Sequence, residues 1–215
     1  MKPERFYELQ QYERQLHTSG ICAIAGVDEA GRGPLAGPVA AGCVIFKSDG
    51  PFPEADDSKK ISEKKREALY EEIISKALSW GVGIADSRLI DEVNILQATH
   101  IAMKRAVEEA CSKISLKPEM VLIDHVRLPD FPYPQMPITH GDALSVTIAS
   151  ASIIAKVTRD RMMLDYAKQY PEYGFEKHKG YGTKSHYDAI RTHGLTPIHR
   201  RSFLKKILEE GENGC

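Results

Sequence analysis

The stretch GVDEAGRGP, residues 26–34, places two adjacent carboxylates directly before an arginine that lies between two glycines. Neighbouring acids repel each other, and glycines weaken the regular element that contains them. Residues 22–28 and 38–47 are short, apolar and bounded by glycine and proline, which predicts two strands with this turn between them. Asp28 and Glu29 at the end of the first strand therefore need a compensating partner.

Hydrophobic periodicity and capping residues predict the remaining elements. In chain order these are a helix from Ser62 to about Leu78, a strand at 80–85, a helix from Asn94, a strand at 120–124, a long helix from GDALS to about Gln169, and helices from Thr183 and near 203–209. The proline-rich residues 129–137 and residues 170–182 are expected to be loops. Strands interleaved with helices indicate an α/β layered fold.

Length and composition are those of one ordinary globular domain, with 215 residues, 42% apolar and 27% charged. We expect residues 1–215 to form a single domain, with a core at about 22–182 and a helical C-terminal portion at about 183–215. The N-terminus is too polar for a signal peptide, and no apolar run approaches membrane-spanning length. The four cysteines lack a C-x-x-C spacing, which fits a reducing compartment. A cytoplasmic protein is expected.

Charge is divided unevenly along the chain, although the net charge is only −1. Residues 1–155 carry 17 Lys and Arg against 22 Asp and Glu, whereas residues 156–206 carry 12 against 5. A basic segment beside an acidic one would suit a metalloenzyme that binds a polyanion. Charge alone favours the simpler interpretation of solvated helix faces.

Three acids lie where the predicted elements begin or end. Asp28 and Asp124 follow apolar strands, and Asp142 follows a glycine just before a helix. One such acid is usually a cap or half of an ion pair, but three that a compact sheet could bring together predict a cation site. Oxygen ligands without His or Cys select Mg²⁺ or Mn²⁺, and paired ions of this kind are a recurring device for phosphoryl transfer. Neighbouring strand residues point to opposite faces, so Glu29 can reach the same cation site as Asp28 only if the strand ends there or if Glu29 contributes its backbone carbonyl.

The Gly31–Arg32–Gly33 turn offers close backbone approach to a ligand. Its exposed N–H and C=O groups could bond a ribose 2′-hydroxyl, the group that distinguishes RNA from DNA, while Arg32 grips a neighbouring phosphate. A tight turn with a solvated arginine remains the alternative at this stage.

Seven runs of sequence, in this order, closely resemble ribonuclease HII. They are GVDEAGRGPLAGPV (26–39), DDSKK (56–60), NILQATHIAMKRAV (94–107), VLIDH (121–125), GDALSVTIASASIIAKVTRDR (141–161), HKGYGT (178–183) and HRRSF (199–203). The resemblance covers about residues 22–204 and leaves out the first 20 residues and the tail after 205. It implies a ribonuclease H-like mixed sheet flanked by helices, with a helical C-terminal portion.

The resemblance also implies a function and a site. The function is a divalent-metal endonuclease, using Mn²⁺ or Mg²⁺, that cuts the RNA strand of RNA–DNA hybrids and cuts 5′ of ribonucleotides embedded in duplex DNA, leaving 5′-phosphate and 3′-hydroxyl ends. The family's catalytic and metal-binding acids fall on Asp28, Glu29, Asp124 and Asp142, and its substrate contacts fall on Gly31, Arg32, Gly33, Ser58, Lys59 and Tyr181. Residues 57–60 (DSKK) resemble the family's phosphate-contacting loop. A monomer is expected, with hybrid binding that weakens as salt rises.

Three competing functions were weighed. A DNA-directed nuclease of related fold would not need a 2′-hydroxyl reader, so the glycine turn and Tyr181 argue against it. Ribonuclease HIII generally carries a large N-terminal substrate-binding domain, and only about 20 residues precede the first strand here. A catalytically lapsed hybrid-binding module should have lost at least one acid, and all four are present.

Overall fold

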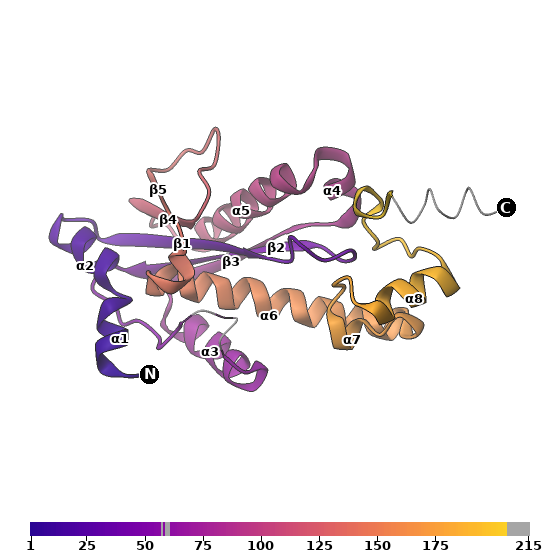
Figure 1. The fold of residues 1–215 in the computed structure, drawn as a ribbon. Coiled ribbons are helices and arrows are strands. Elements are labelled where there is room, and N and C mark those ends of the chain that lie inside the picture. Colours follow the sequence, from indigo (N-terminus) through magenta and orange to yellow (C-terminus); the bar gives the residue numbers. More distant parts are fainter. Residues whose placement is uncertain (57, 59–60, 206–215) are drawn as a thin grey trace.

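A five-stranded mixed sheet forms the centre of the molecule in the computed structural model, which describes residues 1–56, 58 and 61–205 (Figure 1). The strands are β1 (Ala23–Ala30), β2 (Val39–Lys47), β3 (Ser79–Ala85), β4 (Met120–Asp124) and β5 (Gln135–Ile138). They lie in the order β3-β2-β1-β4-β5. The first three strands are antiparallel neighbours, whereas β1, β4 and β5 run parallel to one another.

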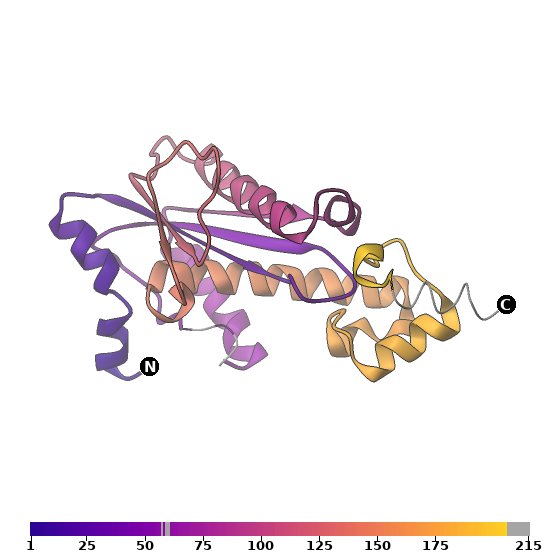
Figure 2. The ribbon, with the colours of Figure 1, turned by 45° about the horizontal axis from the view of Figure 1, so that its top comes forward.

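Helices cover both faces of this sheet and extend beyond its two ends. They are α1 (Pro3–Glu8), α2 (Gln11–Thr18), α3 (Glu63–Lys76), α4 (Ser87–Val93), α5 (Ile95–Ser112), α6 (Val146–Gln169), α7 (Phe175–His178) and α8 (Lys184–His193), with 3₁₀ turns η1 (Gly141–Ala143), η2 (Pro171–Tyr173) and η3 (Arg201–Phe203). Figures 1 and 2 show α5 on one face and α6 on the other, α1 and α2 at one end, and α7 and α8 at the opposite end. No helix among the described residues is long and apolar enough to cross a bilayer.

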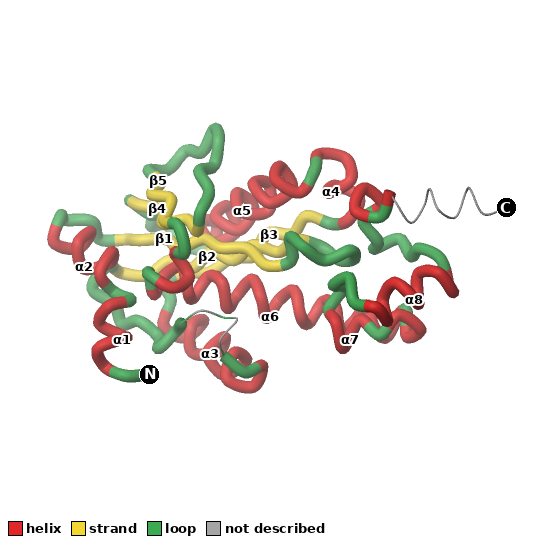
Figure 3. Tube along the Cα trace, viewed as in Figure 1, coloured by secondary structure: helices red, strands yellow, loops and turns green. Residues whose placement is uncertain are grey.

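Helices lie on both sides of the strands (Figure 3), and alternation of the strand side chains builds a core on each face of the sheet. Val27 and Cys43 are fully buried in the cluster that includes the apolar face of α5. On the other face, Gly42 lies against the backbone of α6, where an added Cβ would collide with the carbonyl oxygen of Ala151. α6 therefore packs directly against β2 and against β1, the strand that carries Asp28.

The α/β layered, mixed-sheet fold predicted from the sequence is confirmed, as is the cap predicted at Ser62, whose side chain accepts a backbone N–H at the start of α3. The structure shows that the side chains of Asn94, Ser145 and Thr183 do the same for α5, α6 and α8. Of the cysteines in the described residues, Cys43 is buried, Cys111 is partly buried and Cys22 is exposed, and none forms a disulfide.

Several element boundaries differ from the prediction. The first strand does not end at Asp28 but continues to Ala30, because its last residue still pairs with Ala40 of β2. The proline-rich loop contains β5, which tolerates Pro137 because it lies at the sheet edge. The loop predicted at 170–182 contains η2 and α7.

Other elements were absent from the prediction. Helices α1, α2 and α4 have only 6, 8 and 7 residues, too few to show a clear hydrophobic period, and none of them was predicted. The helix predicted near 203–209 falls mostly outside the described residues, which show η3 ending at Phe203.

Candidate active site

Asp28 and Asp124 lie side by side at equivalent positions of parallel neighbouring strands. The register pairs Val27 with Ile123, and each aspartate is the next residue along its strand. Asp28 is 4% exposed, and its Oδ1 accepts the backbone N–H of Glu29 at 2.7 Å. Burial, followed by the negative charges of Glu29 and Asp124, raises the pKa of Asp28 well above its usual range. This carboxyl group would be stabilised in its ionised form by a cation.

Glu29 points to the opposite face of β1 from Asp28, since successive strand side chains alternate. Its Oε1 lies 3.5 Å from Nη1 of Arg32, so Glu29 forms an ion pair with the arginine of the glycine turn. Burial raises the pKa of Glu29, the Arg32 charge opposes that rise, and Asp124 adds to it. β1 therefore continues past both acids, and the negative charge of Asp124 still raises the pKa of each of them.

The backbone around Asp124 and Asp142 is bent to bring the two acids together. The N–H of Gly141 donates to Oδ1 of Asp124 at 2.7 Å, and Asp142 is the next residue. His125 (φ 61°) and His140 (φ 58°) both adopt the left-handed conformation, which is uncommon for residues with a side chain. Asp142 is 7% exposed within η1, so it precedes the long helix by a short turn instead of capping it.

The four acids supply the oxygen ligands that a hard divalent cation requires. Within the described parts of the chain, no three His, Cys, Asp or Glu side chains already converge on one point. Hydrogen bonds direct the carboxylates elsewhere, to the Glu29 amide, the Arg32 guanidinium and the Gly141 amide. The chemistry of the set and the raised pKa values of Asp28 and Glu29 fit a divalent cation, which would draw these side chains inward.

Two buried arginines hold the glycine turn and the residues that follow it. Arg200, fully buried, donates from Nη2 to the carbonyl of Gly31 at 2.6 Å, from Nη1 to Arg32 at 2.8 Å and from Nε to Gly37 at 3.0 Å. Arg159 of α6, 1% exposed, donates to the carbonyls of Ala36, Pro38 and Lys179. Burial and the Arg159 charge lower the pKa of Arg200 to about 9. The basic segment therefore also contributes interior contacts, which its sequence pattern did not reveal.

A pocket brings part of the predicted site together with groups that were not predicted. It is lined by Glu29, Gly31, Arg32, Gly33, Ser58 and Tyr181, and also by Ser152, Lys156 and Arg159 of α6. Tyr181 is 47% exposed, and its Cε1 would lie 3.7 Å from a Cβ placed on Gly33. The turn and the tyrosine, which are distant in sequence, therefore lie beside each other in one pocket.

The predicted phosphate loop is only partly visible. Ser58 is 2% exposed, and its hydroxyl lies 2.9 Å from that of Ser152, which in turn bonds Asp28. A substrate contact by Ser58 therefore stays a prediction, since its side chain faces inward. Lys59 lies outside the described residues.

A chain of histidines supports the segment that carries Tyr181. Nδ1 of His186 lies 2.9 Å from the carbonyl oxygen of Tyr181, so it must donate, and Nε2 of this neutral ring must accept. That Nε2 lies 3.1 Å from Nε2 of His199, whose own Nδ1 accepts the N–H of Thr196 at 2.9 Å. Sequence reasoning missed both histidines, since their spacing carries no recognisable pattern.

Comparison with known proteins gives one consistent result. The family model described as Ribonuclease HII matches residues 25–206. A curated Ribonuclease HII from Caldanaerobacter subterraneus subsp. tengcongensis is 52% identical over 206 residues, covering 96% of this chain and 84% of that protein.

Solved structures extend this likeness to the fold. The ribonuclease H2 of Pyrococcus horikoshii OT3 is 27% identical, with a TM-score of 0.66 over 84% of this chain and 93% of that one. Bst-RNase HIII in complex with Mn²⁺ shares the fold at 16% identity, with a TM-score of 0.65 over 86% of this chain and 66% of that one.

Proposed function

Because this chain belongs to the ribonuclease HII family of metal-dependent endoribonucleases that act on RNA–DNA hybrids, we propose that it also cuts 5′ of single ribonucleotides embedded in duplex DNA. The products would carry a 5′-phosphate and a 3′-hydroxyl. The observation that supports this most is the shared pocket of Glu29, the glycine turn and Tyr181. In this pocket the glycine turn would bind the ribose 2′-hydroxyl and Tyr181 would support the next sugar, both beside Glu29 as an acid of the proposed cutting site.

Asp28, Glu29, Asp124 and Asp142 would hold the divalent cations. When bound, these ions would activate the attacking water and stabilise the 3′-oxygen leaving group. The Asp28 carboxyl accepts the Glu29 amide and that of Asp124 accepts the Gly141 amide, and a bound cation would draw both carboxylates toward the shared site. We propose Mg²⁺ or Mn²⁺ as the ion, on the oxygen-only ligand set and on the Mn²⁺ found with Bst-RNase HIII.

The glycine turn would read the ribose through its amides. A trans peptide directs its C=O and N–H in opposite directions. Since the carbonyls of Gly31 and Arg32 point to the buried Arg200, the N–H groups of Arg32 and Gly33 point away from it. Both residues line the pocket, so these amides can donate to a 2′-hydroxyl there. Arg200 fixes the turn before the substrate binds, which lowers the entropic cost of binding the ribose.

Cleavage of three matched duplexes tests this function. One duplex is all DNA, one carries a single ribonucleotide and one is a continuous RNA–DNA hybrid, each with Mg²⁺, Mn²⁺ or EDTA. We expect cleavage of the second and third duplexes only with metal, and ligation to show a 5′-phosphate. Hybrid cleavage without any cut at the single ribonucleotide would overturn the proposed specificity.

We also propose that the chain acts as a single-domain monomer. All described strands join one sheet. At one end of it Leu16 of α2 lies in a cluster with Ile24 of β1, and at the other end Ile190 of α8 lies in a cluster with Met163 of α6. Light scattering across a range of concentrations tests this, and a mass of twice the 24.0 kDa chain would contradict it.

A further inference from the structure

The N-terminal helices α1 and α2 hold the segment that contains Asp142. The family match begins only at residue 25, so these helices lie ahead of it. Their contacts nevertheless fall on residues 143–147 and on Asp56, next to the predicted phosphate loop. The helices stand at the end of the sheet where α6 begins (Figures 1 and 2).

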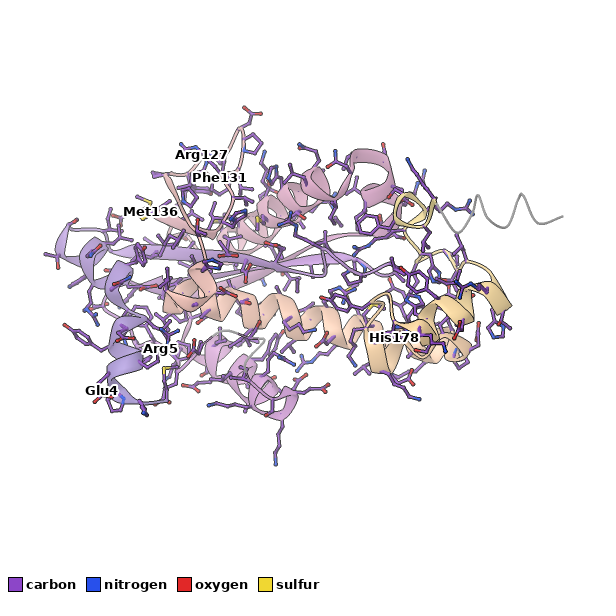
Figure 4. The ribbon with its side chains drawn as sticks, in the orientation of Figure 1. Glu4, Arg5, Arg127, Phe131, Met136 and His178 are labelled. Atoms are coloured by element: carbon purple, nitrogen blue, oxygen red, sulfur yellow. The ribbon has the colours of Figure 1, made fainter. Side chains whose placement is uncertain are left out.

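Arg5 of α1 joins two loops with one guanidinium group. Its Nη2 donates to the carbonyl oxygen of Ala143 at 2.9 Å and to Oδ1 of Asp56 at 2.8 Å. Its Nε lies 3.3 Å from Oδ2 of the same aspartate, which makes the pair bidentate. Figure 4 shows Arg5 on α1 at the side of the neighbouring loop and helix, while Glu4 lies on the outer side. The last residue of η1 is thereby tied to the segment at Asp56.

Glu13 of α2 holds the start of α6. It is fully buried, and its Oε1 accepts the hydroxyl of Ser145 at 2.6 Å and the N–H of Thr147 at 3.1 Å. The Ser145 hydroxyl oxygen in turn accepts the N–H of Ile148 at 3.2 Å. A carboxylate here also lies at the positive end of the helix dipole. Leu9 adds a backbone contact, since its carbonyl accepts the N–H of Val146 at 2.8 Å.

Asp142 therefore lies between two anchored neighbours. On one side Gly141 is hydrogen-bonded to Asp124, and on the other side Ala143 is hydrogen-bonded to Arg5. We propose that Arg5 and Glu13 are positioning residues, which hold η1 so that the Asp142 carboxylate faces the divalent-ion site. This inference rests on the proposed function, because it takes Asp142 as a ligand of that ion.

Loss of either contact should leave the sheet intact but let η1 shift. Groups that orient metal ligands typically change metal affinity or activity by about 10–100-fold when they are removed. Arg5 and Glu13 act through the backbone on Asp142, so we expect the lower end of that range, about tenfold. Binding of the nucleic acid through the basic segment should hardly change, because these residues lie at the opposite end of the sheet from α8.

The test compares Arg5→Ala and Glu13→Ala, which remove the two contacts, with the control Glu4→Ala, on the same N-terminal segment but with an exposed side chain. Calorimetry with Mn²⁺ alone measures metal affinity without turnover. We expect about tenfold weaker Mn²⁺ binding and lower kcat, with an unchanged KM for the hybrid and unchanged control values. A lower free energy of unfolding with unchanged Mn²⁺ affinity would show that both residues only stabilise the fold, and would overturn the proposal.

Two further variants keep the test decisive. If Arg5→Ala does not fold, Arg5→Lys retains the charge and can satisfy Asp56 or Ala143 but not both in the same geometry, so an intermediate loss of Mn²⁺ affinity is expected. Asp142→Asn then separates the two ideas. If it leaves Mn²⁺ binding unchanged, the assignment of Asp142 as a ligand fails. If it weakens Mn²⁺ binding while Arg5→Ala adds the same loss on top, the two act independently and the positioning role fails.

Discussion

His199 and His186 face each other through their Nε2 atoms, 3.1 Å apart, and one proton is shared between those atoms. His186 uses its other nitrogen to donate to Tyr181, so His199 must supply the proton. Both rings are buried, and each touches Phe175. An added proton would make one of these buried rings positively charged and would remove one of the pair's two acceptor nitrogens.

A pH-dependent stability follows from this pair. Burial first, and the neighbouring ring second, lower the pKa of His199 to about 4, and burial also lowers that of His186. Between pH 6.5 and about 4 the unfolded chain therefore binds more protons than the folded one, so this contribution to stability is lost as the pH falls. Each unit of pKa displacement corresponds to about 1.4 kcal/mol.

Denaturant unfolding at several pH values from 7 to 4.5 measures this contribution as the difference between wild type and His199→Gln. The difference removes the opposite trend of buried acids such as Asp28, whose raised pKa makes the fold relatively more stable in acid. We expect the variant to lose less stability on acidification. Parallel curves would show that folding does not lower the pKa of His199.

Arg200→Lys should damage the glycine turn without removing a positive charge. Arg200 bonds three carbonyls, those of Gly31, Arg32 and Gly37, with three different nitrogens. A lysine has one nitrogen and cannot reproduce that fork. A destabilisation of about 1–3 kcal/mol is expected, since buried carbonyls lose their partners.

Cleavage should fall further than stability explains, because the amides of the turn lose their fixed direction. The measurement is kcat/KM at a temperature where the variant is still fully folded. Arg201→Lys, at the exposed neighbouring residue, is the matched control. If a destabilised Arg200→Lys variant cleaves at the wild-type rate, substrate recognition does not depend on the turn geometry that Arg200 fixes.

Asp124→Asn should lose turnover by orders of magnitude while the fold holds. The Oδ1 atom of asparagine can still accept the Gly141 N–H, so the local geometry remains. The charge that raises the pKa of Asp28 and Glu29 disappears, and the melting temperature should stay the same or rise. The checks are kcat at saturating Mg²⁺ and a thermal melt. Near wild-type turnover would remove Asp124 from the site.

Sequence patterns anticipated the acids because strand ends are readable. Apolar runs that stop on an acid located Asp28 and Asp124, and the parallel register then placed them together. The extent of β1 was misjudged, since nothing in DEA marks where pairing with β2 ceases. Glycine at 31 suggested an earlier end than the ladder shows.

The supporting residues were invisible in the sequence for a physical reason. Arg159 and Arg200 look like parts of a basic surface, yet their burial depends on carbonyls contributed by a turn more than 100 positions away. Glu13 resembles a solvated helix residue, and only the docking of α2 on α6 makes it a cap. Such roles arise from tertiary contacts, which local periodicity does not encode.

Gly31 and Gly33 should respond differently to alanine. Gly31 has φ of +94°, and an added Cβ would collide with the Arg159 side chain, so Gly31→Ala should lose stability together with activity. At Gly33 the nearest atom is Cε1 of Tyr181 at 3.7 Å, an ordinary contact, so the fold should accept a methyl group. That methyl projects into the pocket and should block the ribose.

The comparison is made on one pair of assays, thermal unfolding and hybrid cleavage. We expect Gly33→Ala to keep the wild-type melting temperature and to lose cleavage of every substrate. Full activity in Gly33→Ala would mean that the sugar does not approach this part of the turn. Stable, active Gly31→Ala would contradict the strained geometry itself.

Tyr181→Ala should change substrate preference more than it changes the fold. The ring is about half exposed, whereas the contact with His186 uses the backbone carbonyl, which alanine retains. A flat ring can support the deoxyribose that follows a single ribonucleotide, and loss of such stacking costs about 1–3 kcal/mol, or about tenfold and more in rate. On a continuous hybrid the next sugar is a ribose, so less is lost. The measurement is the ratio of kcat/KM for the single ribonucleotide over that for the hybrid, with Tyr181→Phe as the control that keeps the ring. An unchanged ratio in Tyr181→Ala would leave the tyrosine as a packing residue of its loop.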